Sequence, residues 1–333
     1  MATYLGIHGG KIQDYTTDPD NPITGEVWYN STANTIKIES ATTAGSWAAG
    51  NAMNTGRYDG AQSMAGNNSS ALFAGGYTTT IVANVETYNG TNWTETTDIP
   101  TATYAFAGTG ASSTSALVFA GQTPGSPATN ATYEWGGSSW TTGGTLNSGQ
   151  RYRRGAGIQT AALAVGGNGG TPPMTAETEQ YNGSNWTEVG DLNTARTAGS
   201  LGGGAQPNTA ALYFGGYPVP SGGALTELWN GSNWTEVGDL NTARQYVSGA
   251  GTQTSALAFG GGVIPPMTAD TEIWNGTNWT ETTNMSTARY GSSGAGASSA
   301  SAIAAGGTTP GATNAVELWT GAGAPQTKTI DTD

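Results

Sequence analysis

Residues 185–234 read NWTEVGDLNTARTAGSLGGGAQPNTAALYFGGYPVPSGGALTELWNGSNW, a stretch that begins and ends on the same Asn-Trp pair. Its tryptophan recurs along most of the 333-residue chain. The positions are Trp47, Trp93, Trp140, Trp186, Trp234 and Trp279, which lie 46, 47, 46, 48 and 45 residues apart. A spacing this regular indicates one structural unit that is repeated six times.

Each repeat contains short segments typical of β-strands, and none of them keeps a helical period. A Gly/Ala/Ser run is followed by an apolar run that ends in paired glycines, such as Gly215-Gly216. Next comes an aromatic segment, which an Asn-Gly pair such as Asn230-Gly231 separates from the Trp segment. Asn-Gly supplies the positive φ angles that a two-residue hairpin needs. Four short antiparallel strands per repeat predict an all-β protein, a six-bladed β-propeller.

The repeated residues are expected to form the scaffold of this propeller. The Gly/Ala/Ser run suits the crowded innermost strand, and the tryptophans suit the space between blades. Arginines recur at one position of the repeat, and we expect them to bond to carbonyls or an acid of a neighbouring blade: Arg57, Arg196, Arg244 and Arg289. Acidic pairs near the outer strands are expected at solvated strand edges: Glu177 with Glu179, and Asp270 with Glu272.

The two ends of the chain suggest how the propeller closes. The sixth repeat stops at residues 316–321 without a second tryptophan strand, and residues 46–48 supply a matching Ser-Trp-Ala. We therefore expect residues 46–323 to form the propeller, with the N-terminal strand paired to the C-terminal blade so that no sheet edge is left free. Residues 324–333 are expected to be a C-terminal tail.

Residues 1–45 lie outside the repeat and are expected to form a docking or anchoring segment with a short hairpin over residues 26–38. Three aromatic residues fall in this segment, namely Tyr15, Trp28 and Tyr29. Because aromatic side chains favour burial over free solvation, these three are the candidate docking residues.

The composition excludes several kinds of chemistry. The chain has no cysteine and one histidine, and its net charge of −13 includes only 10 Lys and Arg. Disulfides, thiol nucleophiles and histidine triads on the propeller are therefore excluded, and nucleic acid is not expected as a partner. No apolar run approaches the roughly 20 residues of a membrane span, and no secretory signal is evident. We predict no catalytic residue, cofactor or metal site.

Two departures from the repeat give the candidate ligand-binding residues. The third repeat carries Arg151, Arg153 and Arg154 beside Tyr152, and arginine suits contact with an anion, a sugar or another subunit. The loops after the paired glycines also vary between repeats, and their candidates are Pro172, Pro173, Met174, Pro265, Pro266 and Met267. Variable loops on a rigid scaffold are the usual place for recognition, although drift in exposed loops explains the variation equally well.

The repeat resembles the kelch family. A paired glycine ends one strand, a Tyr or Trp follows about a dozen residues later, and a second Trp comes after it; N-T-A-R is similar to the kelch entry into the inner strand. The aromatic-to-Trp spacing is shorter than usual, and the second repeat has Ala120-Gly121 in place of Gly-Gly. The resemblance covers residues 46 to about 323 and implies a kelch-type propeller, but propellers host many unrelated activities.

A narrower resemblance implies a function. The segments G-A-G-T-Q-T-S-A-L-A-F-G-G and W-N-G-[ST]-N-W resemble kelch-like proteins of marine and cyanobacterial phages, and G-E-V-W-Y-N-S-T-A-N-T-I-K-I resembles modules of phage tail fibres and appendages. This implies a virion structural protein, assembled in the host cytoplasm and exposed on the particle, such as a tail fibre, an appendage or an adhesin. Its partners would be other virion proteins through residues 1–45, further copies of itself, and a host-surface glycan on the propeller loops.

Three alternatives remain open from the sequence. The protein is a purely structural capsid or tail decoration protein, an intracellular kelch adaptor, or a carbohydrate-active kelch enzyme. The adaptor is disfavoured because such proteins usually carry additional helical domains. The enzyme is disfavoured because paired acids that face each other across a sugar are not evident.

Overall fold

The computed structural model describes residues 12–19, 25–41, 44–61, 65–125, 128–169, 174–202, 208–219, 221–263, 265–322 and 325–330. These residues form an all-β structure of seven four-stranded sheets. The chain divides into two compact units, a repeat unit of Ser46–Thr320 and a small unit of Met1–Gly45 with Gly321–Asp333. Within the described ranges, no helix is long and apolar enough to cross a membrane.

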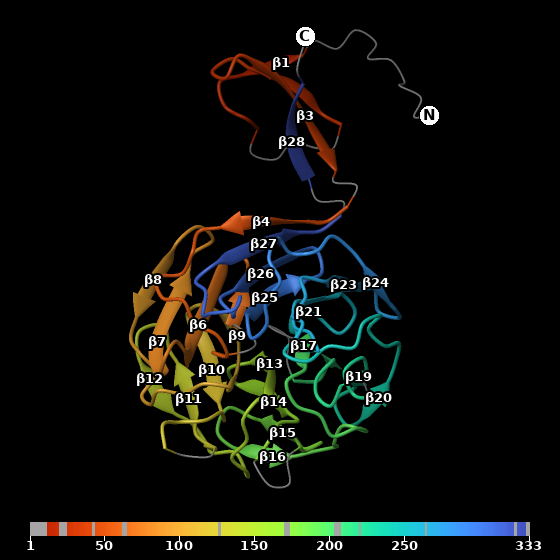
Figure 1. Cartoon of the computed structure of the whole chain (residues 1–333). Helices are drawn as coiled ribbons and strands as arrows, with labels where there is room; N and C mark the ends of the chain where they lie inside the picture. Colours follow the sequence, from red (N-terminus) through yellow and green to blue (C-terminus); the bar gives the residue numbers. More distant parts are fainter. Residues whose placement is uncertain are drawn as a thin grey trace. The chain divides into compact units, whose positions relative to one another are not determined.

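Six of the sheets belong to the repeat unit, and we number them in chain order (Figure 1). The first sheet contains β5 (Ala65–Asn67), β6 (Ser70–Tyr77), β7 (Ile81–Tyr88) and β8 (Trp93–Thr96). The second contains β9 (Ala107–Ser112), β10 (Ser115–Phe119), β11 (Thr132–Trp135) and β12 (Trp140–Thr142). The third contains β13 (Arg154–Ile158), β14 (Ala161–Val165), β15 (Thr178–Tyr181) and β16 (Trp186–Glu188). The fourth sheet contains β17 (Ser200–Gly202), β18 (Ala211–Phe214), β19 (Thr226–Trp229) and β20 (Trp234–Glu236). The fifth contains β21 (Ser248–Gly251), β22 (Ala256–Phe259), β23 (Thr271–Trp274) and β24 (Trp279–Glu281). The sixth contains β25 (Ser293–Ser298), β26 (Ser301–Ala305), β27 (Val316–Thr320) and β4 (Ser46–Gly50).

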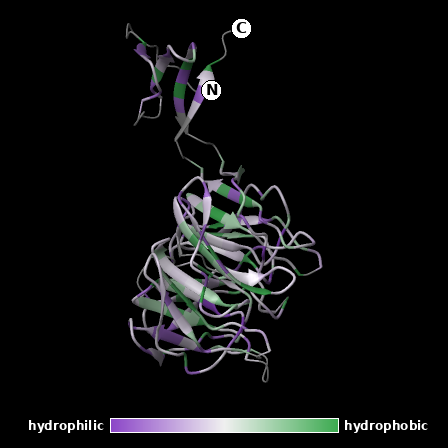
Figure 2. Cartoon of the chain, turned by 90° about the vertical axis from the view of Figure 1, so that its left-hand side faces the viewer, coloured by the Kyte–Doolittle hydropathy of each residue, from purple (hydrophilic) through white to green (hydrophobic). Residues whose placement is uncertain are grey.

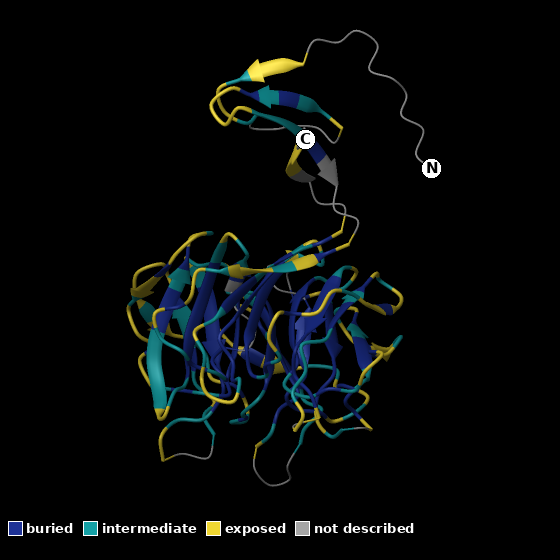
Figure 3. Ribbon diagram, turned by 45° about the horizontal axis from the view of Figure 1, so that its top comes forward, coloured by how far each residue is buried: buried dark blue, intermediate teal, exposed yellow. Residues whose placement is uncertain are grey.

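Each of these sheets follows the order that the sequence predicts. The Gly/Ala/Ser run is the first strand, and the tryptophan strand is the fourth. The Asn-Gly hairpins are confirmed, since β19 and β20 pair antiparallel with Trp229 opposite Trp234, and Gly231 between them has a φ of 95°. Apolar residues concentrate on the strands (Figure 2). The second strand of each sheet is largely buried, whereas much of each tryptophan strand and of the connecting loops is exposed (Figure 3).

The sixth sheet combines strands from both ends of the repeat unit. β4 pairs antiparallel with β27, and Trp47 lies opposite Trp319. The predicted pairing of the N-terminal strand with the last repeat is therefore confirmed. It follows from the sequence of the sixth repeat, which has no tryptophan strand of its own to cover the outer edge of β27.

The first strands of the six sheets contact one another in succession, and β25 also contacts β5. Just before these strands, six residues form a chain of backbone hydrogen bonds in which each N–H donates to the carbonyl of the preceding member. The donor–acceptor pairs are Ala105 to Asp59, Tyr152 to Ala105, Ala198 to Tyr152, Tyr246 to Ala198, Gly291 to Tyr246, and Asp59 to Gly291, over 2.6–3.5 Å. The last bond returns to the first residue. We call this set the backbone ring.

The repeated tryptophans join neighbouring sheets. The indole Nε1 of Trp186 donates to Thr132 Oγ1 of the preceding sheet at 2.9 Å, and Trp234 donates in the same way to Thr178 at 3.0 Å. Trp279 and Trp47 repeat the bond, to Thr226 and Thr271. Their expected role in packing between repeats is confirmed, because each apolar core cluster mixes residues of two adjacent sheets.

The repeated arginines are buried in ion pairs with a glutamate on the third strand of the sheet that follows each arginine. The pairs are Arg57–Glu86 at 2.6 Å, Arg153–Glu179 at 2.6 Å, Arg196–Glu227 at 2.7 Å, Arg244–Glu272 at 2.8 Å, and Arg289–Glu317. Two expectations are corrected. The acid belongs to the arginine's own repeat and not to a neighbouring one, and Glu179 and Glu272 are buried rather than solvated, because each neutralises a guanidinium that would otherwise be buried alone.

The third repeat reaches the same ion pair from a different position. Arg151 pairs with Asn168 as Tyr58 pairs with Tyr77, so Gln150 occupies the place that Arg57 holds in the first repeat. Arg153, three residues further along, supplies the guanidinium to Glu179 instead.

The small unit is one mixed sheet with the order β1-β2-β3-β28. Its strands are β1 (Gln13–Tyr15), β2 (Val27–Asn30), β3 (Thr35–Ala41) and β28 (Pro325–Ile330). β2 and β3 form the predicted hairpin, and β1 pairs parallel to β2. Residues 325–330, expected as part of a tail, pair antiparallel with β3, so this sheet is built from both chain ends.

Candidate functional site

Six tyrosines and one aspartate line a cavity of about 440 Å³ at the entries to the first strands. They are Tyr58, Asp59, Tyr77, Tyr104, Tyr152, Tyr246 and Tyr290. We call this cavity the tyrosine cup. It draws residues from five of the six repeats, so that only an assembly of several sheets creates it.

The backbone ring positions the cup. Asp59, Tyr152 and Tyr246 are members of the ring, with φ angles of 50°, 56° and 52°. Positive φ is uncommon for residues other than glycine, and in bulky residues it indicates a conformation held by the surrounding structure. Here the hydrogen bonds of the backbone ring hold this conformation, and the three side chains line the cup. Residues held in this way cluster at binding sites.

The tyrosine rings are in contact with one another around the cup. Ring centroids lie 5.4 Å apart for Tyr152 and Tyr246 and 5.6 Å apart for Tyr246 and Tyr290. On the other side, Tyr77 lies 5.5 Å from Tyr58 and 5.8 Å from Tyr104. All six tyrosines line the cavity and are half-buried, so each leaves part of its surface accessible. Such side chains combine an apolar face with a polar edge.

Four of the phenols in the cup are neutral at ordinary pH. Burial raises the pKa of Tyr58, Tyr152, Tyr246 and Tyr290, and the nearby Asp59 carboxylate raises it further. A protonated phenol both donates and accepts hydrogen bonds. The cup therefore presents neutral hydroxyls around one carboxylate.

A groove of about 290 Å³ adjoins the cup and shares Tyr152 and Tyr246 with it. Its other lining residues are Arg151, Asn168, Thr197, Ala198, Tyr217 and Gln245. Arg151 Nη1 donates to Gln122 Oε1 at 3.2 Å, which orients the guanidinium at this position. Tyr217 is 46% exposed. The groove adds a cation and an exposed aromatic ring to the neutral cup.

The structure separates the four residues predicted around Arg151. Arg151 and Tyr152 line the groove together. Arg153 is fully buried in its ion pair with Glu179, and it also contacts Glu177 at 3.3 Å. Arg154 is fully buried as well, where its Nε donates to Gly199 O and its Nη1 to Arg153 O. Arg153 and Arg154 therefore belong to the buried scaffold, and neither lines the groove or the cup.

The predicted loop residues that the structure describes do not line these cavities. Pro265 and Pro266 are exposed, and Met174 and Met267 are half-buried. None of the four lines the cup or the groove. Pro172 and Pro173 lie outside the described residues.

The predicted docking aromatics of the small unit differ in exposure. Trp28 is fully buried, and its Nε1 donates to Asp18 Oδ1 at 3.1 Å, so this indole belongs to the core of its own sheet. Tyr15 and Tyr29 are half-buried, and their hydroxyls donate to Gln13 and Asn34. Tyr15 and Tyr29 are the two with surface left for a partner.

Sequence reasoning missed most of the cup, although the signal was present. The position after the repeated arginine is Tyr58, Tyr104 or Tyr290 in three repeats, and the next position is Tyr152 or Tyr246 in two others. Aligning the repeats on their tryptophans brings these tyrosines together, because each lies 11 or 12 residues after the tryptophan that opens its repeat. The cup follows from that alignment and from the convergence of the first strands.

The described residues contain no group of three or more His, Cys, Asp or Glu side chains that could hold a metal ion. The cup offers stacking surfaces, neutral hydroxyls and a carboxylate. No protein-family model matches the chain, and no curated protein matches it either.

Proposed function

We propose that the six sheets of the repeat unit are the blades of a closed, six-bladed, kelch-type β-propeller. Three observations support closure. β25 contacts β5, the sixth sheet recruits β4 from the beginning of the repeat unit, and the backbone ring returns from Gly291 to Asp59. The tyrosine cup then lies at the centre of one face of the propeller, where loops of several blades converge.

We propose further that the tyrosine cup binds a neutral glycan. The main support for this proposal is that six tyrosines line one cavity together with Asp59. A sugar ring has an apolar C–H face, which stacks on aromatic rings, and a rim of hydroxyls. The phenols and the Asp59 carboxylate can exchange hydrogen bonds with that rim. A volume of about 440 Å³ lies within the range of ordinary ligand sites.

The setting that we propose is a phage virion, in which this chain is a tail fibre, appendage or adhesin component. The resemblance of the repeat segments and of residues 25–38 to such proteins supports this setting. The small unit would attach to other virion proteins through surface that includes Tyr15 and Tyr29, and further copies of the chain would assemble beside it. The loop face with the cup would be presented to the host surface.

Glycan-array binding of the full chain tests the cup. Neutral glycans should bind, and Tyr104→Ala and Tyr290→Ala should each weaken binding by about tenfold or more, since hot-spot aromatics carry most of the affinity. Both positions lie outside the backbone ring, which limits their effect on folding. Tyr29→Ala in the small unit is the matched control and should leave binding unchanged.

Two results would overturn parts of the proposal. An array without signal, or a signal that both cup variants retain, would leave a structural or decoration role without receptor binding. Mass spectrometry of purified phage particles tests the setting separately, because a chain that is absent from the particles is not a virion protein whatever it binds.

A further inference from the structure

The second sheet lacks the buried ion pair that the other five sheets contain. Tyr104 pairs with Gln122 as Tyr58 pairs with Tyr77, so Thr103 occupies the arginine position. Tyr133 lies opposite Thr142 as Glu86 lies opposite Glu95, so Tyr133 occupies the glutamate position. Both members of the pair are replaced together, which avoids leaving one buried charge without its partner.

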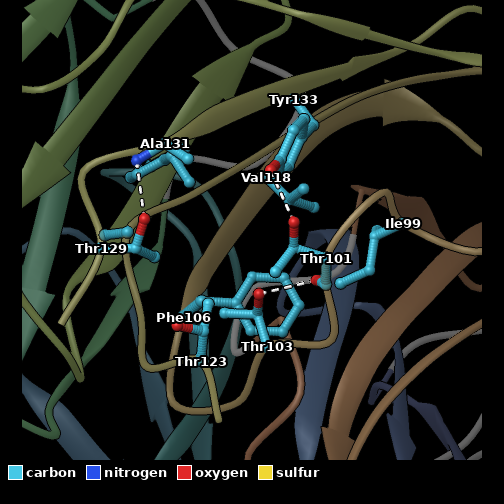
Figure 4. Close-up of a pocket in the computed structure, with 11 residues that line it drawn as sticks. Ile99, Thr101, Thr103, Phe106, Val118, Thr123, Thr129, Ala131 and Tyr133 are labelled. Atoms are coloured by element: carbon cyan, nitrogen blue, oxygen red, sulfur yellow. Dashed lines mark hydrogen bonds between the residues drawn. The ribbon is translucent and has the colours of Figure 1, made fainter. Parts of the chain in front are cut away.

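The replacements do not refill the space. A cavity of about 190 Å³ lies at this place, and Ile99, Thr103, Phe106, Val118, Ala131 and Tyr133 are among its walls (Figure 4). The Tyr133 and Thr101 hydroxyls hydrogen-bond to each other at 3.0 Å, and Thr103 Oγ1 donates to Thr101 O at 2.8 Å. An apolar cavity of about 150 Å³ is large enough to hold benzene, so this one accommodates a six-membered ring with a substituent.

The other sheets show which polar group this space accommodates. Arg196 Nη1 donates to the carbonyls of Gly215 and Leu225, and Arg244 Nη1 donates to those of Gly260 and Asp270. In the second sheet the equivalent residues are Ala120 and Ala131, and both line the cavity. A ligand that occupies the place of the guanidinium therefore meets two backbone carbonyls and is favoured if it carries a hydrogen-bond donor.

The charge of the ligand follows from the lining. All the residues around the cavity are aliphatic, aromatic or hydroxyl-bearing, and none of them is charged. A charged ligand would lose its hydration without gaining a counter-charge, which is costly. A neutral molecule avoids this cost.

We propose that the second sheet holds a binding site for a small neutral ring compound with one hydrogen-bond donor, of the phenol class. The ring of the compound packs against Ile99, Phe106 and Val118. Its hydroxyl donates to a backbone carbonyl whose counterpart in the other sheets accepts a hydrogen bond from arginine. The site shares no lining residue with the tyrosine cup, so it is independent of the proposed glycan site.

Titration of the full chain with phenol, followed by NMR, tests the site. Saturable shifts with a Kd on the order of 1 mM are expected for a ligand of this size, with contacts from the phenol ring to Ile99 and Phe106. Benzoate, which is charged, should not bind at this place. Toluene, which has the same size but no donor, should bind no more tightly than phenol despite its greater hydrophobicity.

The ion pair of the other five sheets provides a variant that fills the cavity. Thr103→Arg combined with Tyr133→Glu restores the repeat's own ion pair in the cavity and should weaken phenol binding by about tenfold or more. Ala131→Leu, which only narrows the space, is the second variant in case the buried pair fails to fold. Absence of saturable binding, or binding that a folded member of these variants retains in full, would overturn the site.

Discussion

Threonines on the third strands of four sheets accept hydrogen bonds from indoles of the next sheet. Thr226 Oγ1 accepts from Trp279 Nε1 at 3.0 Å, and both residues are buried. At the same position the sixth repeat has Val316, which packs in one cluster with Trp93. Trp93 Nε1 is buried and has no hydrogen-bond partner among the described residues. The missing hydroxyl explains the unsatisfied indole.

Thr226→Val should lower the free energy of unfolding by about 1–2 kcal/mol, since it leaves a buried N–H unsatisfied. Urea denaturation measures the effect. Val316→Thr is the reverse change and gives Trp93 an acceptor, so the new hydrogen bond should offset the lost methyl group. A loss in Val316→Thr as large as that in Thr226→Val would contradict this account.

The buried ion pairs give a second prediction for individual residues. Arg196→Met removes the cation but leaves Glu227 buried, and we expect a loss of about 3–5 kcal/mol in the free energy of unfolding. Arg196→Thr with Glu227→Tyr copies the natural combination of the second sheet and should recover at least half of that loss. Urea denaturation of both variants measures the difference. A loss near that of an exposed pair, below about 1 kcal/mol, would contradict the buried pairing.

At the scale of elements, the sequence predicted the strands well and their partners less well. Asn230-Gly231 and the paired glycines identify turns through local backbone chemistry, which does not depend on the rest of the chain. The missing last strand of the sixth repeat pointed to Ser46–Gly50 because a repeat shows what is absent from one copy. β28 gave no such signal, because its pairing with β3 joins segments nearly 290 residues apart in a sheet outside the repeat.

The small sheet depends on one carboxylate that joins its elements. Asp18 accepts hydrogen bonds from Lys37 Nζ at 2.6 Å, Asn30 Nδ2 at 2.8 Å and Trp28 Nε1 at 3.1 Å. These bonds, that of Lys37 first, lower the pKa of Asp18 to about 2. A lowered pKa means that the stabilisation is complete above the unfolded value near 4 and is lost as the pH falls toward 2.

The indole N–H resonance of Trp28 reports on this loss. It should shift and exchange faster with solvent as the pH falls from about 4 to about 2, where Asp18 becomes protonated. In Asp18→Asn the resonance should be nearly independent of pH over this range. An unchanged resonance in the parent chain down to pH 2, or the same transition in Asp18→Asn, would contradict the assignment.

At the scale of the whole molecule, the tyrosine cup is a product of convergence. Five of the six repeats contribute one to three residues each, and these look unremarkable within their own segment, as Tyr104 and Tyr246 do. The sequence therefore singled out Tyr152 through its unusual arginine neighbours and missed the other tyrosines. Their clustering depends on how far each entry segment is turned inward, and the backbone ring determines that through positive φ angles at positions such as Asp59.

The cup also makes the stability of the whole repeat unit sensitive to alkali. Burial raises the pKa of Tyr152 and Tyr246 above the ordinary value near 10, with a further contribution from Asp59. In the unfolded chain both phenols ionise near pH 10, whereas in the folded chain they stay protonated. Their contribution to stability is therefore complete below pH 10 and declines as the pH rises beyond it, by up to about 1.4 kcal/mol per pH unit for each phenol.

Urea denaturation between pH 8 and about 11.5 measures this decline, and absorbance at 295 nm follows the ionisation of the phenols. Tyr152→Phe with Tyr246→Phe removes both hydroxyls but keeps the rings, so its urea midpoint should fall less steeply above pH 10 than that of the parent chain. The rings of the two residues are 5.4 Å apart, and the variant retains that contact. Equal slopes in the two proteins would show that the cup phenols ionise as freely as exposed ones, and the buried, neutral cup on which the glycan proposal rests would then be wrong.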